Sequence, residues 1–144
     1  MIRNLIFDFG GVLIDLDMDA VTRGLRNFGL EEAGPDLVQI SQQYETGKIR
    51  TDHFLREIQR RLPGSREDEI RRIWNATVAG FPRERLDFLE ALKASGEYQM
   101  FLLSNTNPLH VEQARYNMGE RDFKRFRNCF SQFYISHEIG MQKP

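Results

Sequence analysis

The order of hydrophobic and polar positions divides the chain into two kinds of segment. Mostly apolar runs at residues 5–7 and 98–103 each stop abruptly at polar residues, and a third, aromatic-rich run covers residues 133–135. Continuous runs of this length are typical of strands that are buried on both faces of a parallel sheet. We therefore expect three strands, the first of which ends at Asp8.

A helical period replaces these runs between residues 17 and 78. Apolar side chains recur there every three or four positions in four successive stripes, which glycine and proline separate. This is the pattern of short amphipathic helices. Helical spacing returns around residues 86–92 and 109–118. The order strand, helices, strand, helix, strand predicts an α/β fold with a parallel sheet, right-handed crossovers and an inserted helical subdomain.

Composition narrows the class of protein. With 144 residues, of which 40% are hydrophobic and 28% charged, the chain is typical of one globular domain. The net charge of -1 provides no basic excess, so we expect neither a nucleic-acid partner nor a membrane partner. No apolar stretch approaches the roughly 20 residues of a membrane span. The single cysteine, Cys129, cannot form an internal disulfide, and we expect a reducing, cytoplasmic setting.

Polar side chains stand where the predicted strands end. Asp8 follows the first strand, Ser104 and Asn105 follow the second, and Lys143 lies beyond the third. Parallel strands bring their carboxyl ends to one edge of a sheet, which is where ligands bind in open α/β folds. A carboxylate there can attack phosphorus, while hydroxyl and amide donors and a cation hold the phosphoryl oxygens. Because a carboxylate and a phosphate repel each other, we expect Mg²⁺ between them.

Three segments in this order resemble the motifs of the haloacid dehalogenase (HAD) superfamily. Residues 7–13 (FDFGGVL) resemble the first motif, Asp-x-Asp-Gly, and residues 102–107 (LLSNTN) resemble the second. Residues 140–144 (GMQKP) resemble the third, Gly-x-x-Lys-Pro. The helical insert after the first motif is similar to the helical-cap subclass. The acidic stretch at residues 14–17 is similar to the branch of sugar-phosphate phosphatases that includes glucose-1-phosphate phosphatase.

The resemblance implies a fold and a reaction. The fold is a Rossmann-like α/β core of three layers, built from residues 1–14 and 83–144, with a helical cap at residues 15–82. The reaction is the Mg²⁺-dependent hydrolysis of a small phosphomonoester, such as a sugar phosphate, through an aspartyl-phosphate intermediate. The cap would close over the site and select the substrate.

The resemblance also gives a role to each polar residue at the strand ends. Asp8 is expected to be the nucleophile and a Mg²⁺ ligand, and Gly10 is expected to be a second ligand through its main-chain carbonyl. Ser104 and Asn105 are expected to bind the phosphoryl group. Lys143 is expected to pair with Asp8 and with the phosphate.

Two departures from the family pattern bear on activity. Gly10 stands where the family has a second aspartate that acts as general acid and base, a loss of about 10²–10⁴-fold unless another group serves. Asp15 and Asp17 are candidate substitutes. The family's fourth motif, an acidic pair that binds the metal, would lie beyond Pro144. We therefore expect a longer natural protein, and in this chain a narrow sheet whose exposed edge promotes pairing between copies.

Two alternative functions are open at this point. A 2-haloacid dehalogenase also lacks the second aspartate, because a halide leaves without a proton, and it needs no metal. A non-catalytic binding or regulatory module would explain the absence of both the general acid and the fourth motif. Halide release in the presence of a chelator would indicate the first alternative, and an Asp8→Asn variant of unchanged function would indicate the second. The sequence leaves the oligomeric state open.

Overall fold

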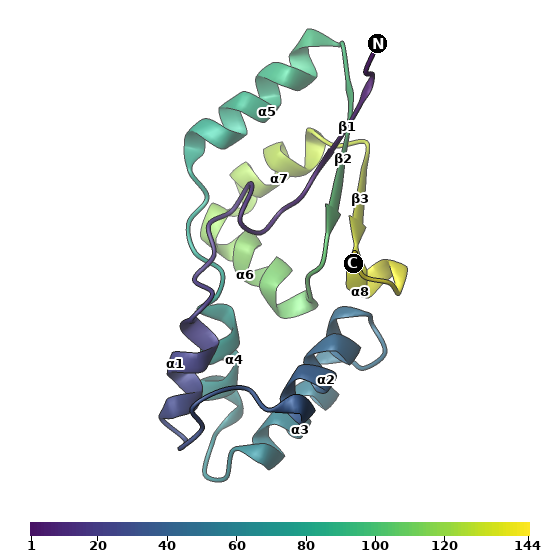
Figure 1. Ribbon diagram of the computed structural model, residues 1–144. Coiled ribbons are helices and arrows are strands. Elements are labelled where there is room, and N and C mark those ends of the chain that lie inside the picture. The colour runs from purple at the N-terminus through teal and green to yellow at the C-terminus, as the bar shows by residue number, and fades with distance from the viewer.

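The computed structural model describes residues 1–144, which fold into a parallel three-stranded sheet beside a group of helices (Figure 1). The strands are β1 (Asn4–Phe7), β2 (Gln99–Ser104) and β3 (Gln132–Ile135). The helices are α1 (Ala20–Arg26), α2 (Pro35–Glu45), α3 (Thr51–Arg61), α4 (Glu67–Asn75), α5 (Arg83–Ser95), α6 (Pro108–Met118), α7 (Glu120–Asn128) and α8 (Ser136–Ile139). The predicted α/β class, parallel sheet and four consecutive helices after β1 are confirmed. None of the helices combines the length and the apolar character that crossing a bilayer requires.

The strand order places β2 in the centre of the sheet, between β1 and β3. All three strands are parallel, with Phe7 opposite Leu102 and Ser104 opposite Ile135. Their carboxyl ends therefore meet at one edge, and this edge faces the helices α1–α4 in Figure 1. The register thus brings together the residues that follow the three strands, as the sequence predicts.

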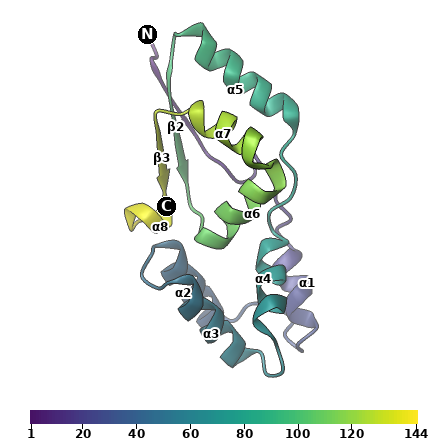
Figure 2. The same ribbon diagram turned by 180° about the vertical axis from the view of Figure 1, so that it is seen from behind.

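Helices cover only one face of the sheet. α5, α6 and α7 lie on the same side of the strands in both views (Figure 1 and Figure 2), and Met100, Leu102 and Ile135 are buried. On the opposite face, Ile6 is 67% exposed and Tyr134 is 40% exposed. The expected burial of the strands on both faces is wrong here, because α5, α6 and α7 cover one face and leave Ile6 and Tyr134 exposed on the other. Of the three expected layers, the structure contains the sheet and one helical layer.

Helix α7 was not predicted. Its sequence, ERDFKRFRN, is mostly charged, and only Phe123 and Phe126 mark an apolar face. Two apolar positions give too weak a period to predict a helix. In the structure Phe126 is fully buried, and its ring centroid lies 5.4 Å from that of Phe9 and 5.2 Å from that of Phe130. The helix therefore forms because Phe126 fills the centre of the core beneath the sheet.

The helices α1–α4 have an apolar core of their own, separate from the core under the sheet. Three aromatic rings form its centre: Tyr44 stacks on Phe54 at 4.3 Å, and Trp74 meets Phe54 edge-on at 5.4 Å. Leu109, at the start of α6, is buried in the same cluster. The two halves of the molecule therefore share apolar packing at the first turn of α6.

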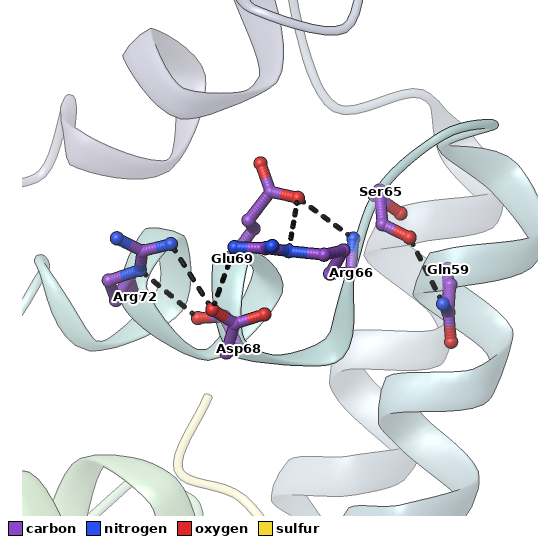
Figure 3. Close-up of polar contacts among 6 residues, drawn as sticks. All are labelled: Gln59, Ser65, Arg66, Asp68, Glu69 and Arg72. Atoms are coloured by element: carbon purple, nitrogen blue, oxygen red, sulfur yellow. Dashed lines mark hydrogen bonds and ion pairs between the residues drawn. The ribbon is translucent and has the colours of Figure 1, made fainter.

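Polar contacts hold the turn between α3 and α4 (Figure 3). The Glu69 carboxylate accepts the main-chain N–H of Arg66 at 3.1 Å and lies 3.4 Å from its guanidinium. The Gln59 side-chain amide donates to the carbonyl of Ser65 at 3.0 Å. These contacts lie within a few residues of one another in sequence, so the turn is fixed locally.

The two segments that connect the sheet to α1–α4 pair with each other. The N–H of Asp15 donates to the carbonyl of Gly80 at 2.8 Å, and the N–H of Ala79 donates back to Asp15 at 2.9 Å. The N–H of Asp17 donates to the carbonyl of Thr77 at 2.9 Å. The chain thus enters and leaves the helical group along one short antiparallel ribbon.

Candidate active site

Asp8 and Lys143 meet directly at the carboxyl edge of the sheet. The Lys143 Nζ lies 3.0 Å from Oδ2 of Asp8 and donates a hydrogen bond to the carbonyl of Leu103 at 3.0 Å. The other carboxylate oxygen of Asp8 accepts the N–H of Phe9 at 2.7 Å. The Asp8 side chain is 44% exposed and that of Lys143 is 29% exposed, so the pair remains open to a small ligand.

A tight turn after β1 positions Asp8. The carbonyl of Phe9 accepts the N–H groups of Leu13 at 2.8 Å and Ile14 at 3.0 Å. Gly11 adopts a φ of 75°, a conformation that favours glycine, and donates to the carbonyl of Ile14 at 2.7 Å. The buried Phe9 ring anchors this turn in the core, so the Asp8 carboxylate is presented from a rigid support.

The structure gives a physical reason for glycine at position 10. A Cβ atom on Gly10 would lie 2.8 Å from Cδ1 of Leu16. An aspartate could stand there only if the Leu16 methyl group moved. The packing of Leu16 therefore fits glycine at position 10, where the family pattern has aspartate.

Asn105 contacts the main chain of Lys143 through both the oxygen and the nitrogen of its side-chain amide. Its Oδ1 accepts the N–H of Lys143 at 2.8 Å, and its Nδ2 donates to the carbonyl of Lys143 at 3.2 Å. Its own main-chain N–H has no hydrogen-bond partner in the protein. The structure thus brings Asn105 and Lys143 together and leaves the Asn105 N–H free to donate to a ligand.

Ser104 is the last residue of β2, between Leu103 and Asn105. It is 3% exposed, and both of its neighbours along the chain contact Lys143. Of the predicted site residues, Asp8, Asn105 and Lys143 are therefore joined by direct contacts, and Ser104 lies at the same edge of the sheet. Their catalytic and binding roles stay predictions.

Asp15 and Asp17, the candidate substitutes for a general acid, each pair with an arginine. Asp15 lies 3.0 Å from the Arg85 guanidinium, and Asp17 forms an ion pair with Arg23. The hydrogen bond from Arg23 lowers the pKa of Asp17, which makes its carboxyl a poor proton donor at neutral pH. Neither carboxylate contacts Asp8 or Lys143, so the structure offers no support for this substitution.

Sequence reasoning missed the residues that join α2 to the segment carrying Lys143. The Gln142 amide donates to the Glu45 carboxylate at 2.6 Å, and burial raises the pKa of Glu45. The Tyr44 hydroxyl accepts the N–H of Leu109 at 3.2 Å and shares a hydrogen bond with the Thr51 hydroxyl at 2.7 Å. The contacts of Gln142 with Glu45 and of Leu109 with Tyr44 link residues far apart in sequence, and no local pattern marks them.

Ser136 was also missed. It is 1% exposed, and its hydroxyl accepts the N–H of Thr106 at 2.9 Å and donates to the Thr106 carbonyl at 2.9 Å. Ser136 begins α8, whose end leads to Lys143. In the sequence it is one serine among others, and only its partner in space distinguishes it.

The donors near Asp8 suit a hard divalent cation. The Asp8 carboxylate and the Gly10 carbonyl are oxygen ligands, and the Gly10 carbonyl accepts no hydrogen bond from the protein. No group of three or more histidine, cysteine, aspartate or glutamate side chains that could hold a metal is present, here or elsewhere in the structure, so Asp8 is the one carboxylate available at this edge. Magnesium is usually held by one or two carboxylates, with water and substrate oxygens completing its shell. The chemistry of this edge therefore fits Mg²⁺.

Comparison with known proteins shows likeness along the whole chain, although no protein-family model matches it. The chain is 32% identical over 152 aligned residues to D-ribitol-5-phosphate phosphatase of Bacteroides thetaiotaomicron, covering 100% of the chain and 72% of that protein. A crystal structure of a HAD family enzyme from the same species with magnesium has a TM-score of 0.85 at 32% identity, covering 99% of the chain and 72% of that enzyme. A structure of that enzyme with magnesium and inorganic phosphate has a TM-score of 0.81 at 30% identity, covering 100% and 73%.

Proposed function

Because the chain belongs to the HAD-like hydrolase superfamily, we propose that it is a Mg²⁺-dependent phosphatase that hydrolyses a small phosphorylated sugar or polyol. The observation that carries this proposal is the contact between Asp8 and Lys143, 3.0 Å apart at the carboxyl edge of the sheet. A relative that covers the entire chain is a phosphatase of a phosphorylated polyol. D-ribitol 5-phosphate is therefore the first substrate to test.

The reaction begins with Asp8. One carboxylate oxygen of Asp8 attacks phosphorus, an aspartyl-phosphate bond forms, and the bond from phosphorus to the substrate oxygen breaks. Water then attacks the aspartyl-phosphate, which releases inorganic phosphate and restores the carboxylate. The Lys143 ammonium, the Ser104 hydroxyl and the free N–H of Asn105 supply the charge and donors that hold the phosphoryl oxygens.

Asp8 and the carbonyl of Gly10 would hold the Mg²⁺ ion. When bound, Mg²⁺ supplies positive charge that offsets the repulsion between the carboxylate and the phosphate. Gly10 carries no acid to protonate the departing alkoxide, so water is left as the donor for that step. The rate is therefore expected to depend strongly on the basicity of the leaving group.

We divide the chain, within this proposal, into a core of residues 1–14 and 83–144 and a helical cap of residues 15–82. Two separate apolar clusters support the division, and so does the ribbon of paired linkers near Asp15 and Ala79. The cap would enclose the substrate against the sheet edge and exclude water from it. A reducing, cytoplasmic setting is consistent with one buried cysteine, Cys129, whose thiol pKa is raised by burial.

The first prediction tests the nucleophile. With Mg²⁺ present, the chain is expected to release phosphate from D-ribitol 5-phosphate, and Asp8→Asn is expected to lower kcat by at least about 10³-fold, because an amide is a very weak nucleophile. A chelator should abolish turnover. Phosphate release measured with a colorimetric assay checks these outcomes.

Asp17→Asn is the matched control for this experiment. It makes the same chemical change nine residues further along the chain, at a carboxylate engaged by Arg23, and should leave kcat within a few-fold. Equal turnover by the wild type and Asp8→Asn would overturn the proposal. Halide release from a 2-haloacid in the presence of a chelator, with no phosphate release, would identify a dehalogenase instead.

A further inference from the structure

Four hydrogen bonds from two side chains join the segment that follows β2 to the segment that follows β3. Asn105 makes two of them with the main chain of Lys143, at 2.8 and 3.2 Å. Ser136 makes the other two with the main chain of Thr106, at 2.9 Å each. We call these four hydrogen bonds the loop clamp. The partners lie 38 residues apart in the first pair and 30 in the second, so the clamp is purely tertiary.

The clamp begins where the sheet ends. The ladder between β2 and β3 has its last pair at Ser104 and Ile135. The next residues on the two chains, Asn105 with Thr106 and Ser136 onward, have left the strands, and side chains replace the main-chain ladder there. The hydrogen bonds of the ladder do not reach the segment that carries Lys143. The clamp fixes the distance between that segment and Ser104 instead.

Asn105 uses its amide oxygen and one of its two amide N–H groups on the main chain of Lys143, which leaves one side-chain N–H without a protein partner. Lys143 is thereby held at its main chain by Asn105 and at its Nζ by the carbonyl of Leu103 and the carboxylate of Asp8. The side chain of Asn105 thus acts on the position of Lys143.

Ser136 is suited to hold Thr106 because one hydroxyl can donate and accept at the same time. Ser136 is 1% exposed and Thr106 is 6% exposed. Removing the hydroxyl would leave both the N–H and the carbonyl of Thr106 buried without these partners, which is costly. The residue that the clamp fixes is only two positions beyond Ser104.

We propose that Asn105 and Ser136 are positioning residues, which set Ser104 and Lys143 as one rigid unit against Asp8. This inference rests on the proposed phosphatase function. Precise placement of groups around a reacting phosphoryl is worth a large share of the rate, and a displacement of about 1 Å can cost on the order of 10²-fold. Asn105 acts through Lys143, and Ser136 acts through Thr106, which follows the last residue of β2, Ser104, by two positions.

The experiment measures phosphate binding as well as turnover. Ser136→Ala and Asn105→Ala are each expected to weaken the binding of inorganic phosphate, measured calorimetrically with Mg²⁺ present, by about 10-fold, and to lower kcat by about 10- to 100-fold. Ser65→Ala is the matched control. Ser65 is also a buried serine, but its hydroxyl has no partner, so its removal should change neither quantity.

A double-mutant cycle separates positioning from general destabilisation. The loss caused by Asn105→Ala should largely disappear in a Lys143→Ala background, because Asn105 acts through Lys143. If Asn105→Ala acted only by lowering stability, the loss that it causes would be the same in the wild type and in the Lys143→Ala variant. Hydrogen exchange at the Thr106 amide should accelerate in Ser136→Ala and stay unchanged in Ser65→Ala.

The outcomes distinguish the two proposals. If the wild type hydrolyses phosphoesters but Asn105→Ala and Ser136→Ala bind phosphate and turn over normally, the positioning role of the loop clamp is wrong and the phosphatase function stands. If the wild type hydrolyses none, the phosphatase function is wrong, and the phosphate affinities and the double-mutant cycle still test the clamp. Additive losses for Asn105→Ala and Lys143→Ala would overturn the positioning role of Asn105.

Discussion

At the scale of single residues, Lys143 is held from several sides before any substrate binds. Its ammonium contacts Asp8 and the carbonyl of Leu103, and its main chain contacts Asn105. Charge that is oriented in advance costs no reorganisation when the reaction proceeds. Under the proposed function, this arrangement places an oriented positive charge beside the Asp8 carboxylate, where the phosphoryl group would bind.

The absence of an acid at Gly10 leads to a prediction about the leaving group of the substrate. Because no acid stands there, we expect the wild type to favour p-nitrophenyl phosphate, which has a good leaving group, over D-ribitol 5-phosphate by a large ratio of kcat/KM. The double variant Gly10→Asp with Leu16→Ala supplies a carboxyl and removes the methyl group that a Cβ would meet at 2.8 Å. It should reduce that ratio by at least about 10-fold, since general acid catalysis contributes roughly 10²–10⁴-fold.

Leu16→Ala alone is the control for the double variant. It creates the same space without the acid, so its ratio of kcat/KM between the two substrates should equal that of the wild type. If the ratio stays the same in the double variant as well, the proton on the leaving group does not limit the reaction, or its donor lies elsewhere. Either result would contradict the idea that the missing acid at Gly10 limits the rate.

At the scale of elements, the turn between α2 and α3 rests on α8 by a main-chain contact. Gly47 has a φ of 73°, and a Cβ atom there would overlap the carbonyl oxygen of His137. The neighbouring Glu45 accepts a hydrogen bond from Gln142. This turn therefore lies against the segment that leads to Lys143, and a glycine is required for this approach.

Gly47→Ala should destabilise the protein by more than its backbone conformation alone explains. Gly64 is the matched comparison, because it also has a positive φ, 85°, but has no atom near the position of a Cβ. Both variants should lose about 1–2 kcal/mol through the left-handed conformation. Gly47→Ala should lose about 1–3 kcal/mol more, because the added atom forces α8 and the turn apart.

Chemical denaturation of the two glycine variants checks this difference. Equal free energies of unfolding would mean that the turn does not press on His137. The same contact has a second consequence: Gly47→Ala should lower phosphatase activity, because it displaces the segment of Lys143, whereas Gly64→Ala should not.

At the scale of the whole molecule, α6 connects the cap and the core. Leu109 is buried in the apolar cluster of the cap, and its N–H donates to the hydroxyl of Tyr44. The ring of His110 hydrogen-bonds through Nε2 to the carbonyl of Trp74 at 2.9 Å. Since α6 begins at Pro108, shortly after Ser104 and Asn105, these contacts join α1–α4 to the helix that follows the candidate phosphate site.

These contacts make the stability of the whole protein depend on pH. Burial lowers the pKa of His110 below its usual value near 6.5, and burial also lowers the pKa of His137. Below about pH 6.5 the unfolded chain binds protons that the folded chain resists. The free energy of unfolding should therefore fall as the pH decreases from about 7 towards 5, by about 1.4 kcal/mol for each unit by which a pKa is lowered.

His110→Gln should make this pH dependence weaker, because glutamine does not titrate and its amide can still donate to the carbonyl of Trp74. Part of the dependence should persist through His137. Urea denaturation of both proteins at a series of pH values measures the slope. An identical slope in the wild type and the variant would show that His110 is not the group responsible.

Much of the fold and part of the site can be predicted from local pattern. The apolar runs predict three parallel strands, helical spacing predicts α1–α4, and the polar residues after each run predict that Asp8, Asn105 and Lys143 meet. The same reasoning misses α7, whose apolar face has only two phenylalanines. It also misjudges the face of the sheet that carries Ile6, because burial depends on which elements cover a strand.

Local pattern along the chain is enough to predict the order of strands and helices and the polar side chains at the strand ends, because both depend on residues that are neighbours in sequence. Three features become visible only in the folded molecule: Asn105 contacts the main chain of Lys143, Ser136 contacts that of Thr106, and Leu16 occupies the space beside Gly10. These contacts join residues that the chain separates, and they exist because packing of the core brings two loops to one edge.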